Sequence, residues 1–379
     1  MDYTAQKFAF QVSKVLRYVR IYGVWRTLIK IKGQYHMKKA YEALPKLDSQ
    51  IRAGGHIGLI GSGNYSFSNV AYYLRKEHGA VIRGAMDTNI HRAASLYEHY
   101  GLRYYTDDAR KIIADPAIDS VFIASNHASH ADYAIECINA GKDVHIEKPH
   151  VVSENQLSRL ASAMRAHPES KVFLGFNRPR SVLFKELQEL LSAQRGPMMI
   201  NWFIAGHEIP DGHWYFDEKE GGRVLGNLCH WTDLTLRLVG MSNAFPCTIV
   251  PATPAGSKSD YVVSVLFADK SCASITFSAK GHTFEGVREV LNIHRGDLLA
   301  NLTDFHSLTA EVVAKKTKHR LLHRDHGQEA NILNSSTSKA GEDPAYIIST
   351  AKFFLAIRQA IDSGQTVVLG SAETTGCSS

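Results

Sequence analysis

The chain has 379 residues, of which 44% are hydrophobic and 21% are charged, and its formal net charge is +6. This length exceeds one ordinary hydrophobic core, so two domains are expected. The composition is that of a folding globular protein, and no apolar run approaches the roughly 18 residues needed to span a bilayer, which argues against a transmembrane protein.

The positive charge is concentrated near the N-terminus. Residues 1–55 hold 11 Lys and Arg against 3 Asp and Glu, a local balance of +8, so the remaining residues carry about −2. The body of the protein is therefore not basic, and no nucleic-acid partner is predicted. Five widely spaced cysteines without a CxxC pair, and no secretory leader, predict a reduced cytoplasmic protein.

Residues 11–22 carry apolar side chains at helical spacing and basic side chains on the other side, which predicts an amphipathic basic helix interrupted near Gly23. Two roles for this helix stay open. It packs against the body or a partner subunit, or it lies peripherally on an anionic membrane surface.

Between Gly54 and Pro149 the pattern alternates between strands and helices, which predicts a doubly wound parallel sheet. The expected strands cover residues 56–60, 81–87, 120–125 and 143–147, and the expected helices cover residues 66–77, 90–100, 107–114 and 130–140.

After Ser153 a helix and a strand ending at Gly175-Phe176-Asn177 precede several closely spaced strand-like runs, which predicts an α+β domain with a largely antiparallel open sheet. Its expected strands cover residues 198–205, 261–268, 271–279 and 287–294, with a polar loop at 315–345 and a last helix at 344–362. The expected organisation is an N-terminal extension (1–53), a Rossmann domain (54–150), a substrate and oligomerisation domain (151–370) and a flexible tail (371–379).

The first strand of the Rossmann region runs into Gly61-Ser-Gly63-Asn64-Tyr65-Ser66. Gly61 permits a tight turn, Gly63 lets backbone amides approach a pyrophosphate, and the small Ser66 lets the helix pack close to the strand. The start of that helix then faces the phosphates. Residues 61 and 63–66 are therefore predicted to bind a dinucleotide.

Asp87, at the end of the second strand, follows Gly63 by 24 residues. An acidic residue there accepts hydrogen bonds from the adenosine ribose hydroxyls and repels a 2′-phosphate, which favours NAD. Arg92 leaves NADP as the alternative cofactor. The alternative for Asp87 is a solvated residue in a turn.

Several stretches together resemble the Gfo/Idh/MocA oxidoreductases, a family named for glucose-fructose oxidoreductase, inositol dehydrogenase and a rhizopine catabolism protein. The matching stretches are GLIGSGNY, SNHASHADYAIECINAGKDVHIEKP, GFNRPRS, GGRVLGNLCHWTDLTLRLVG and LFADKSCASITF, in order between about Gly58 and Phe277. The resemblance implies that Lys148 contacts the nicotinamide ribose and the substrate hydroxyl, and that His230 is the general acid/base. It also implies oligomers formed through the second sheet.

Histidine and lysine suit these roles chemically, because oxidising an alcohol requires a base for the hydroxyl proton and a cation beside the developing alkoxide. Asn227, His230 and Asp233 are spaced to share one side of a helix that starts near Gly226. Many members of the family carry an aspartate where Gly226 stands. In this chain, the role of orienting His230 then passes to Asn227 or Asp233, or catalysis is weakened.

Polar residues near the strand ends complete the predicted cofactor site. Ser125, Asn126 and His130 lie at or after the end of the expected strand at 120–125, where the nicotinamide half is expected, and Glu147 precedes Lys148. The alternative for Lys148 is a surface ion pair with Glu147.

The candidate substrate contacts include an arginine and an aromatic face, which suit a sugar or sugar phosphate. They are Asn177, Arg178, Trp214, Asn227 and Asp233. A plain surface position is the alternative for Arg178. A metal site is not predicted, although His127 with His130 and the run His319, His323 and His326 invite that interpretation.

These features predict an NAD(P)-dependent oxidoreductase acting on a hydroxyl or keto group of a sugar or nucleotide sugar. The family resemblance, together with the basic N-terminal extension, implies surface-polysaccharide synthesis as its setting. Two other functions stay open: a glycoside hydrolase that uses NAD transiently, and a dinucleotide-binding sensor or partner subunit without turnover.

Overall fold

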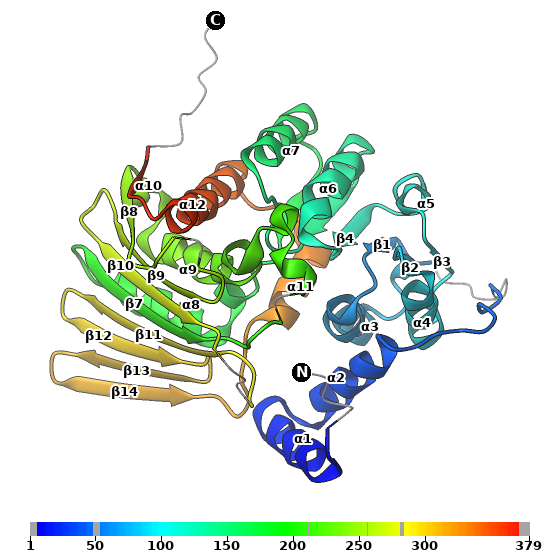
Figure 1. Cartoon of the computed structure of the whole chain (residues 1–379), viewed down its shortest axis with the longest axis horizontal. Helices are drawn as coiled ribbons and strands as arrows, with labels where there is room; N and C mark the ends of the chain where they lie inside the picture. Colours follow the sequence, from blue (N-terminus) through cyan, green and yellow to red (C-terminus); the bar gives the residue numbers. More distant parts are fainter. Residues whose placement is uncertain (1–5, 48–53, 211, 256, 281–283, 371–379) are drawn as a thin grey trace, which may run out of the picture. The chain divides into compact units, whose positions relative to one another are not determined.

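The computed structural model describes residues 6–47, 54–210, 212–255, 257–280 and 284–370. They form two compact units (Figure 1). The first contains residues 1–177 and 328–344, and the second contains residues 178–327 and the stretch from 345 onwards. The predicted flexible tail, 371–379, lies outside the described residues.

The first unit is built on a parallel sheet with the strand order β3-β2-β1-β4-β5-β6. All four residues of β1 are buried, as expected of a strand with helices on both faces. The predicted doubly wound Rossmann sheet is confirmed. The strands are β1 (Ile57–Ile60), β2 (Ile82–Met86), β3 (Tyr104–Thr106), β4 (Ser120–Ile123), β5 (Asp143–Ile146) and β6 (Val172–Leu174).

The helices between these strands begin and end where local signals place them. The side chain of Asn89 caps α4 by accepting from the amide of His91, and Gly101, with φ +65°, ends that helix in the left-handed region. These helices are η2 (Ser66–Val70, a π-helical turn), α3 (Ala71–His78), α4 (Ile90–Tyr100), α5 (Ala109–Ile113), η3 (His127–Ser129, a 3-10 turn), α6 (His130–Asn139), α7 (Glu154–Ala166) and α11 (Gln328–Thr337).

The N-terminal extension forms two helices, α1 (Phe8–Tyr22) and α2 (Val24–His36), separated by Gly23 with φ +82°. The sequence pattern predicted only the first. Ile29 of α2 is buried in the same apolar cluster as Phe67. The extension therefore packs against the Rossmann domain, which was one of its two expected roles.

The second unit contains a mixed sheet with the order β14-β13-β12-β11-β7-β10-β9-β8-β15, in which only the β7–β10 pair is parallel. The predicted, largely antiparallel sheet is confirmed. Its strands are β7 (Met198–Ala205), β8 (Cys247–Pro251), β9 (Asp260–Leu266), β10 (Cys272–Ser278), β11 (Arg288–Arg295), β12 (Leu298–Thr303), β13 (Ser307–Val312), β14 (Lys315–Arg320) and β15 (Val367–Leu369).

Helices such as α8 (Val182–Ser192) and α9 (Cys229–Val239) pack on one side of this sheet, and β7 alternates buried and exposed residues accordingly. The other helices of the unit are η4 (Arg178–Arg180), η5 (Trp214–Phe216), η6 (Glu218–Glu220), η7 (Val224–Leu228), α10 (Met241–Ala244) and α12 (Pro344–Ser363). No helix among the described residues is long and apolar enough to cross a membrane.

Two expectations differ from the structure. The predicted loop at 315–345 contains β14 and α11. All residues of β14 are exposed, because an edge strand rich in lysine has no buried face and so lacks the alternating pattern of an inner strand. The first unit also continues beyond residue 150 through α7, because β6 pairs with β5 and extends the parallel sheet.

Candidate active site

The carboxyl ends of the inner parallel strands meet at one edge of the Rossmann sheet. Ile60 of β1 is in register with Met86 of β2 and Ile123 of β4, and Ile123 is in register with Ile146 of β5. The residues that follow these strands therefore share this edge, and they include Gly61, Asp87, Ser125 and Lys148. The strand order reverses between β1 and β4, which is where open α/β sheets bind their ligands.

The glycine-rich loop requires glycine at its first position. Gly61 has φ +92°, and a Cβ there would lie 2.4 Å from the carbonyl oxygen of Ala124. A Cβ on Gly63 would meet nothing within 4 Å, so its lack of a side chain leaves open space beside the loop. Ser66 is buried and donates a hydrogen bond to the Gly61 carbonyl. This arrangement fits a diphosphate approaching the start of the following helix.

Asp87 is only 8% exposed, so the alternative of a solvated turn residue is wrong. Its carboxylate accepts hydrogen bonds from the backbone amides of Ser62 (2.8 Å) and Asn89 (2.9 Å). Asp87 thus joins the glycine-rich loop to the end of β2. Arg92 lies in the next helix, and its buried Nε has no hydrogen-bond partner among the described residues.

Glu147 lies at the centre of a buried polar chain next to Lys148. Its carboxylate is 3.3 Å from Nε2 of His145 and accepts from the backbone amide of Lys148 (3.3 Å). His145 Nδ1 lies 2.8 Å from the hydroxyl of Ser335 in α11. Burial and the adjacent Glu147 carboxylate raise the pKa of Tyr65, so the Tyr65 phenol faces this group.

Glu147 and Tyr65 were predicted site residues, but the buried chain that joins them to His145 was not predicted. The available signal was the i, i+2 spacing of His145 and Glu147, which places both side chains on the same face of the sheet. Glu147 is buried, so it cannot form the surface ion pair with Lys148 that was the alternative interpretation. Lys148 itself is partly exposed.

His130 connects the loops that follow β4 and β5. Its two ring nitrogens lie 2.8 Å from the Pro149 carbonyl and 3.1 Å from the Ser125 carbonyl. Burial lowers the pKa of this imidazole. The ring therefore supports the backbone on either side of the predicted nicotinamide position. Asn126 is exposed on the same loop, and its side chain accepts a hydrogen bond from Ser129 (2.6 Å).

In the second unit, the π-helical turn η7 leads into α9. Asn227 and His230 are partly exposed, whereas Asp233 is fully buried. Its carboxylate accepts from Arg237 (3.0 Å) and from the hydroxyl of Tyr346 (2.7 Å). The expectation that all three polar residues share an accessible face is therefore wrong for Asp233. It lies about 120° around the helix from Asn227, and that side of α9 is packed inside the unit.

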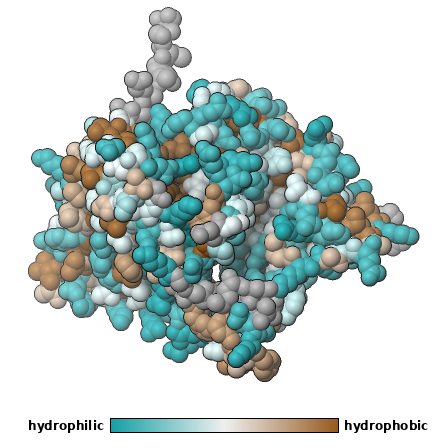
Figure 2. All heavy atoms as spheres, in the orientation of Figure 1, coloured by the Kyte–Doolittle hydropathy of each residue, from teal (hydrophilic) through white to brown (hydrophobic). Residues whose placement is uncertain are grey.

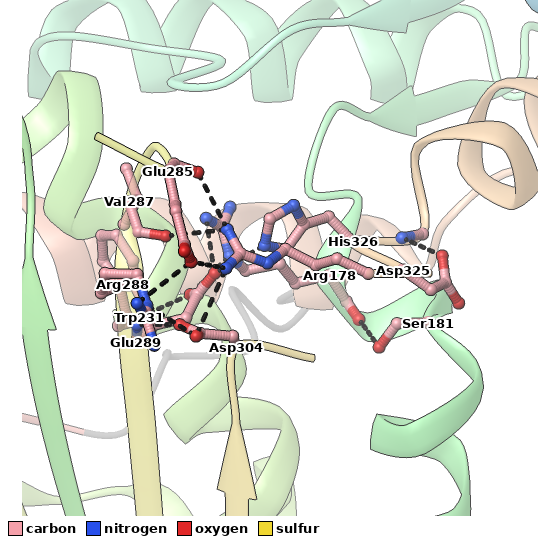
Figure 3. A network of polar contacts seen from close by, with 12 residues as sticks. Arg178, Ser181, Trp231, Glu285, Val287, Arg288, Glu289, Asp304, Asp325 and His326 are labelled. Carbon is pink, nitrogen blue, oxygen red and sulfur yellow. Dashed lines mark hydrogen bonds and ion pairs between the residues drawn. The ribbon is translucent and has the colours of Figure 1, made fainter. Parts of the chain in front are cut away.

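Arg178 lies in a buried polar network (Figure 3), so the alternative of a plain surface residue is wrong. Its guanidinium donates two hydrogen bonds to Glu289, at 2.8 and 3.1 Å, and lies 5.0 Å from the centre of the Trp231 ring. His326 Nε2 lies 2.9 Å from Oε1 of Glu289, the oxygen that also accepts the longer of the two Arg178 hydrogen bonds. Burial raises the pKa of Glu289, but the charge of Arg178 and the His326 hydrogen bond outweigh it and hold this pKa at about 2.

The other two predicted substrate contacts differ in exposure. Asn177 is 5% exposed at the end of the first unit, whereas Trp214 is 44% exposed in the second unit. The Trp214 ring lies against Tyr215 and His213, with centroids 4.5 and 5.5 Å away. Trp214 therefore presents an aromatic surface to solvent, and Asn177 does not present its side chain openly.

Two histidine groups invited a metal interpretation. Within the described ranges, no cluster of three or more His, Cys, Asp or Glu side chains could hold a metal ion. His319 instead pairs with Glu186 at 2.7 Å, and His326 belongs to the network around Glu289.

Comparison with known proteins identifies the first unit. Residues 56–176 match the family model described as "Oxidoreductase family, NAD-binding Rossmann fold". Oxidoreductase P35 of Formosa agariphila is 29% identical over 138 residues, which cover 36% of this chain and 42% of that protein. Inositol 2-dehydrogenase 3 of Saccharopolyspora erythraea is 30% identical over 137 residues, which cover 36% and 40%. The chain thus spans about two fifths of the length of these curated relatives.

Solved structures share the fold over most of the chain. A putative myo-inositol dehydrogenase from Sinorhizobium meliloti superposes with a TM-score of 0.68 and 16% identity, covering 83% of this chain and all of that one. A levoglucosan dehydrogenase in complex with NADH and levoglucosan gives a TM-score of 0.69 at 18% identity, covering 82% and 98%. Residues 56–176 thus match the NAD-binding Rossmann domain of the Gfo/Idh/MocA oxidoreductase family.

Proposed function

We propose that the protein is an NAD-dependent oxidoreductase that transfers a hydride between the nicotinamide and a CH–OH carbon of a sugar-like substrate. The observation that supports this most is the common edge reached by the glycine-rich loop, Asp87 and Lys148, because their strands end in register. Ligands of doubly wound sheets bind at this edge.

NAD, when bound, supplies the hydride acceptor for alcohol oxidation. Lys148 then holds its ammonium beside the substrate oxygen and stabilises the developing alkoxide. His230 accepts the hydroxyl proton. The buried Glu147 holds the backbone of Lys148, and His130 supports the loops on either side, so both act by positioning.

Calorimetric titration with NAD tests the cofactor, and reduction of NAD in the presence of individual polyols and sugars tests the reaction. Myo-inositol and levoglucosan are rational first probes, because dehydrogenases of those compounds share this fold. We expect NAD to bind and at least one polyol or sugar to drive its reduction. A protein that binds neither NAD nor NADP would refute the proposal.

We propose that Asp87 makes the protein prefer NAD. Replacing Asp87 with asparagine removes the negative charge that opposes a 2′-phosphate. We expect the ratio of the NADP and NAD dissociation constants to fall by about tenfold, mainly through tighter NADP binding. The exposed Asp107→Asn variant is a charge-matched control and should leave the ratio unchanged. An unchanged ratio in Asp87→Asn would assign selectivity to other residues, Arg92 first among them.

The substrate class is proposed from the aromatic surface at Trp214 and the hydroxyl chemistry of the fold. Sugars and polyols stack their apolar faces on aromatic rings while polar groups bind their hydroxyls. Nucleotide sugars and a role in surface-polysaccharide synthesis are the narrower form of this proposal. We also propose a homo-oligomer, assembled through the outer face of the second sheet, in the cytoplasm.

We propose that α1 and α2 also contact anionic membrane surfaces. Phe8, Val12 and Leu16 of α1 are 80%, 40% and 66% exposed, and Trp25 of α2 is 77% exposed. Figure 2 shows hydrophobic side chains gathered at the lower end of the view, where α1 lies in Figure 1. Residues 7–39 contain nine Lys and Arg and no Asp or Glu. Exposed apolar side chains beside basic ones suit an interfacial helix.

Sedimentation with lipid vesicles tests this contact. We expect binding to vesicles that contain phosphatidylglycerol, weaker binding to pure phosphatidylcholine, and loss of binding at high salt. Replacing both Phe8 and Trp25 with serine should abolish it. Val313→Ser, at a residue that is 81% exposed in the second unit, is the control. Equal binding to both lipids would contradict an electrostatic contribution.

A further inference from the structure

The N-terminal extension is attached directly to the glycine-rich loop. His36, at the end of α2, is 3% exposed. Its Nε2 lies 2.7 Å from the Ser62 carbonyl and its Nδ1 lies 2.9 Å from the Ser95 hydroxyl. The His36 ring also stacks on Phe67, with centroids 4.3 Å apart. The end of α2 is therefore bound to the same loop whose amides face the predicted diphosphate.

Two further contacts hold α2 against the helix that follows this loop. Arg26 donates hydrogen bonds to the Ser68 carbonyl and to the side chain of Asn69. Gly33 faces the side chain of Asn64, and a Cβ on Gly33 would lie 2.4 Å from its Oδ1. The extension thus approaches residue 64 so closely that a side chain at residue 33 would require the Asn64 side chain to move.

A cavity of about 460 Å³ lies between α1, α2 and the glycine-rich loop. Its wall includes Asn64 and Tyr65 of the loop, Ser68 of the helix that follows it, and Lys14 and Lys30 of the extension. Among the described residues that line the cavity are two lysines and no acidic residue, so this part of its wall is basic. Its volume is within the range of small-molecule sites.

Lys14 is unusual for a lysine because it is buried, with only 8% of its surface exposed. Burial lowers the pKa of its ammonium to about 8. An incoming anion would stabilise this charged form. No aspartate or glutamate occurs between Asp2 and Glu42, so this stretch of the extension carries only basic charges.

We propose that the N-terminal helices complete the cofactor site, and that Lys14 and Lys30 bind the diphosphate of the dinucleotide from the side opposite the glycine-rich loop. Backbone amides at the start of a helix bind phosphate oxygens on one side, and ammonium groups bind them on the other. Ordinary Rossmann sites use the loop alone for this purpose. This inference rests on the proposed cofactor binding and adds a second element to it.

Binding of ADP-ribose, which carries the diphosphate without the nicotinamide, is the direct test. The variants are Lys14→Met and Lys30→Met, and the control is Lys7→Met, an exposed lysine of the same extension that does not line the cavity. We expect each cavity variant to weaken ADP-ribose and NAD by about tenfold, since a hydrogen bond to a charged group is lost. Adenosine, without phosphate, should bind equally to all variants.

Misfolding is separated from this effect by thermal unfolding. Methionine preserves the volume of lysine and avoids burying a charge, so the melting temperature of Lys14→Met should equal or exceed that of the wild type. The dependence of the ADP-ribose dissociation constant on salt should also become shallower in both cavity variants.

Three outcomes are decisive. Weakened ADP-ribose binding in the cavity variants, with unchanged adenosine binding, supports the inference. If the wild type binds NAD but Lys14→Met and Lys30→Met match Lys7→Met within about twofold, the extension does not bind the diphosphate and this inference alone is wrong. If the wild type binds neither ADP-ribose nor NAD, the proposed cofactor function itself is wrong.

Discussion

Replacing Lys148 with methionine is expected to lower kcat by about a thousandfold, while the dissociation constant for NAD stays within about fivefold of the wild type. The reason is that the Lys148 ammonium stabilises charge that develops on the substrate oxygen, and methionine fills similar space without a charge. The measurement is the initial rate of NAD reduction with the best substrate found among polyols and sugars, together with calorimetry of NAD.

Lys171→Met is the matched control for this variant. Lys171 precedes β6 and pairs with Asp143 at 2.8 Å, at the opposite end of β5 from Lys148. Its replacement should leave kcat unchanged. If Lys148→Met retains activity within about fivefold of the wild type, the ammonium at residue 148 does not stabilise the reacting oxygen.

Initial rates of NAD reduction also test whether Lys148 and His230 act on one chemical step. His230→Asn should lower kcat by about a hundredfold, because the hydroxyl proton loses its base. Groups that act together are not additive, so the double variant should be about as slow as the Lys148→Met variant alone. A double variant slower by the product of both factors would indicate independent roles.

Replacing Arg178 with methionine is expected to destabilise the second unit by about 3–5 kcal/mol, because the Glu289 carboxylate would stay buried without its main counter-charge. Glu289 is 1% exposed and also accepts a hydrogen bond from the Trp231 indole at 2.8 Å. The measurement is urea unfolding followed by tryptophan fluorescence, since Trp202, Trp214 and Trp231 all lie in this unit.

Arg288→Met is the control for this loss. Arg288 pairs with Asp304 at 2.7 Å, but its side chain is 47% exposed and Asp304 also pairs with Arg324. Its replacement should cost less than about 1 kcal/mol. A loss below about 1 kcal/mol in Arg178→Met would mean that water or another cation compensates Glu289.

Low pH should cause part of the same loss of stability in the wild-type protein. The pKa of Glu289 is held near 2, below its ordinary value of 4.5, so the folded state binds this proton less readily than the unfolded chain does. The stabilisation is therefore fully present above about 4.5 and decreases as the pH falls towards about 2. The stability difference between the wild type and Glu289→Gln should shrink over the same interval.

Local patterns in the sequence predicted the elements that depend on near neighbours. The helix at 90–100 and the strand at 198–205 were predicted with the bounds that the structure has, because caps, periodicity and β-branched or aromatic residues act over a few residues. Elements that were missed for the opposite reason include β14 and α2. β14 has no buried face, and α2 follows α1 after one glycine, so neither gives an isolated periodic signal.

Candidate site residues divide in a similar way. Gly61, Asp87 and Lys148 were recognisable because each directly follows a strand that reads as buried, and parallel strands bring their ends together. Arg178 and Asp233 looked like accessible polar residues. Their partners, Glu289 and Tyr346, lie more than a hundred residues away, so spacing along the chain gave no indication of burial.

The sequence by itself determined the class of fold and the dinucleotide loop, because these follow from short motifs on predictable strands and helices. The two residues proposed for catalysis came from the family resemblance and stay a prediction. Only the tertiary structure decided that Asp87, Glu147, Arg178 and Asp233 are buried and bonded within the protein, and that the basic N-terminal helices lie against the glycine-rich loop. The physical reason is that burial and charge pairing depend on contacts between distant parts of the chain, which local spacing does not encode.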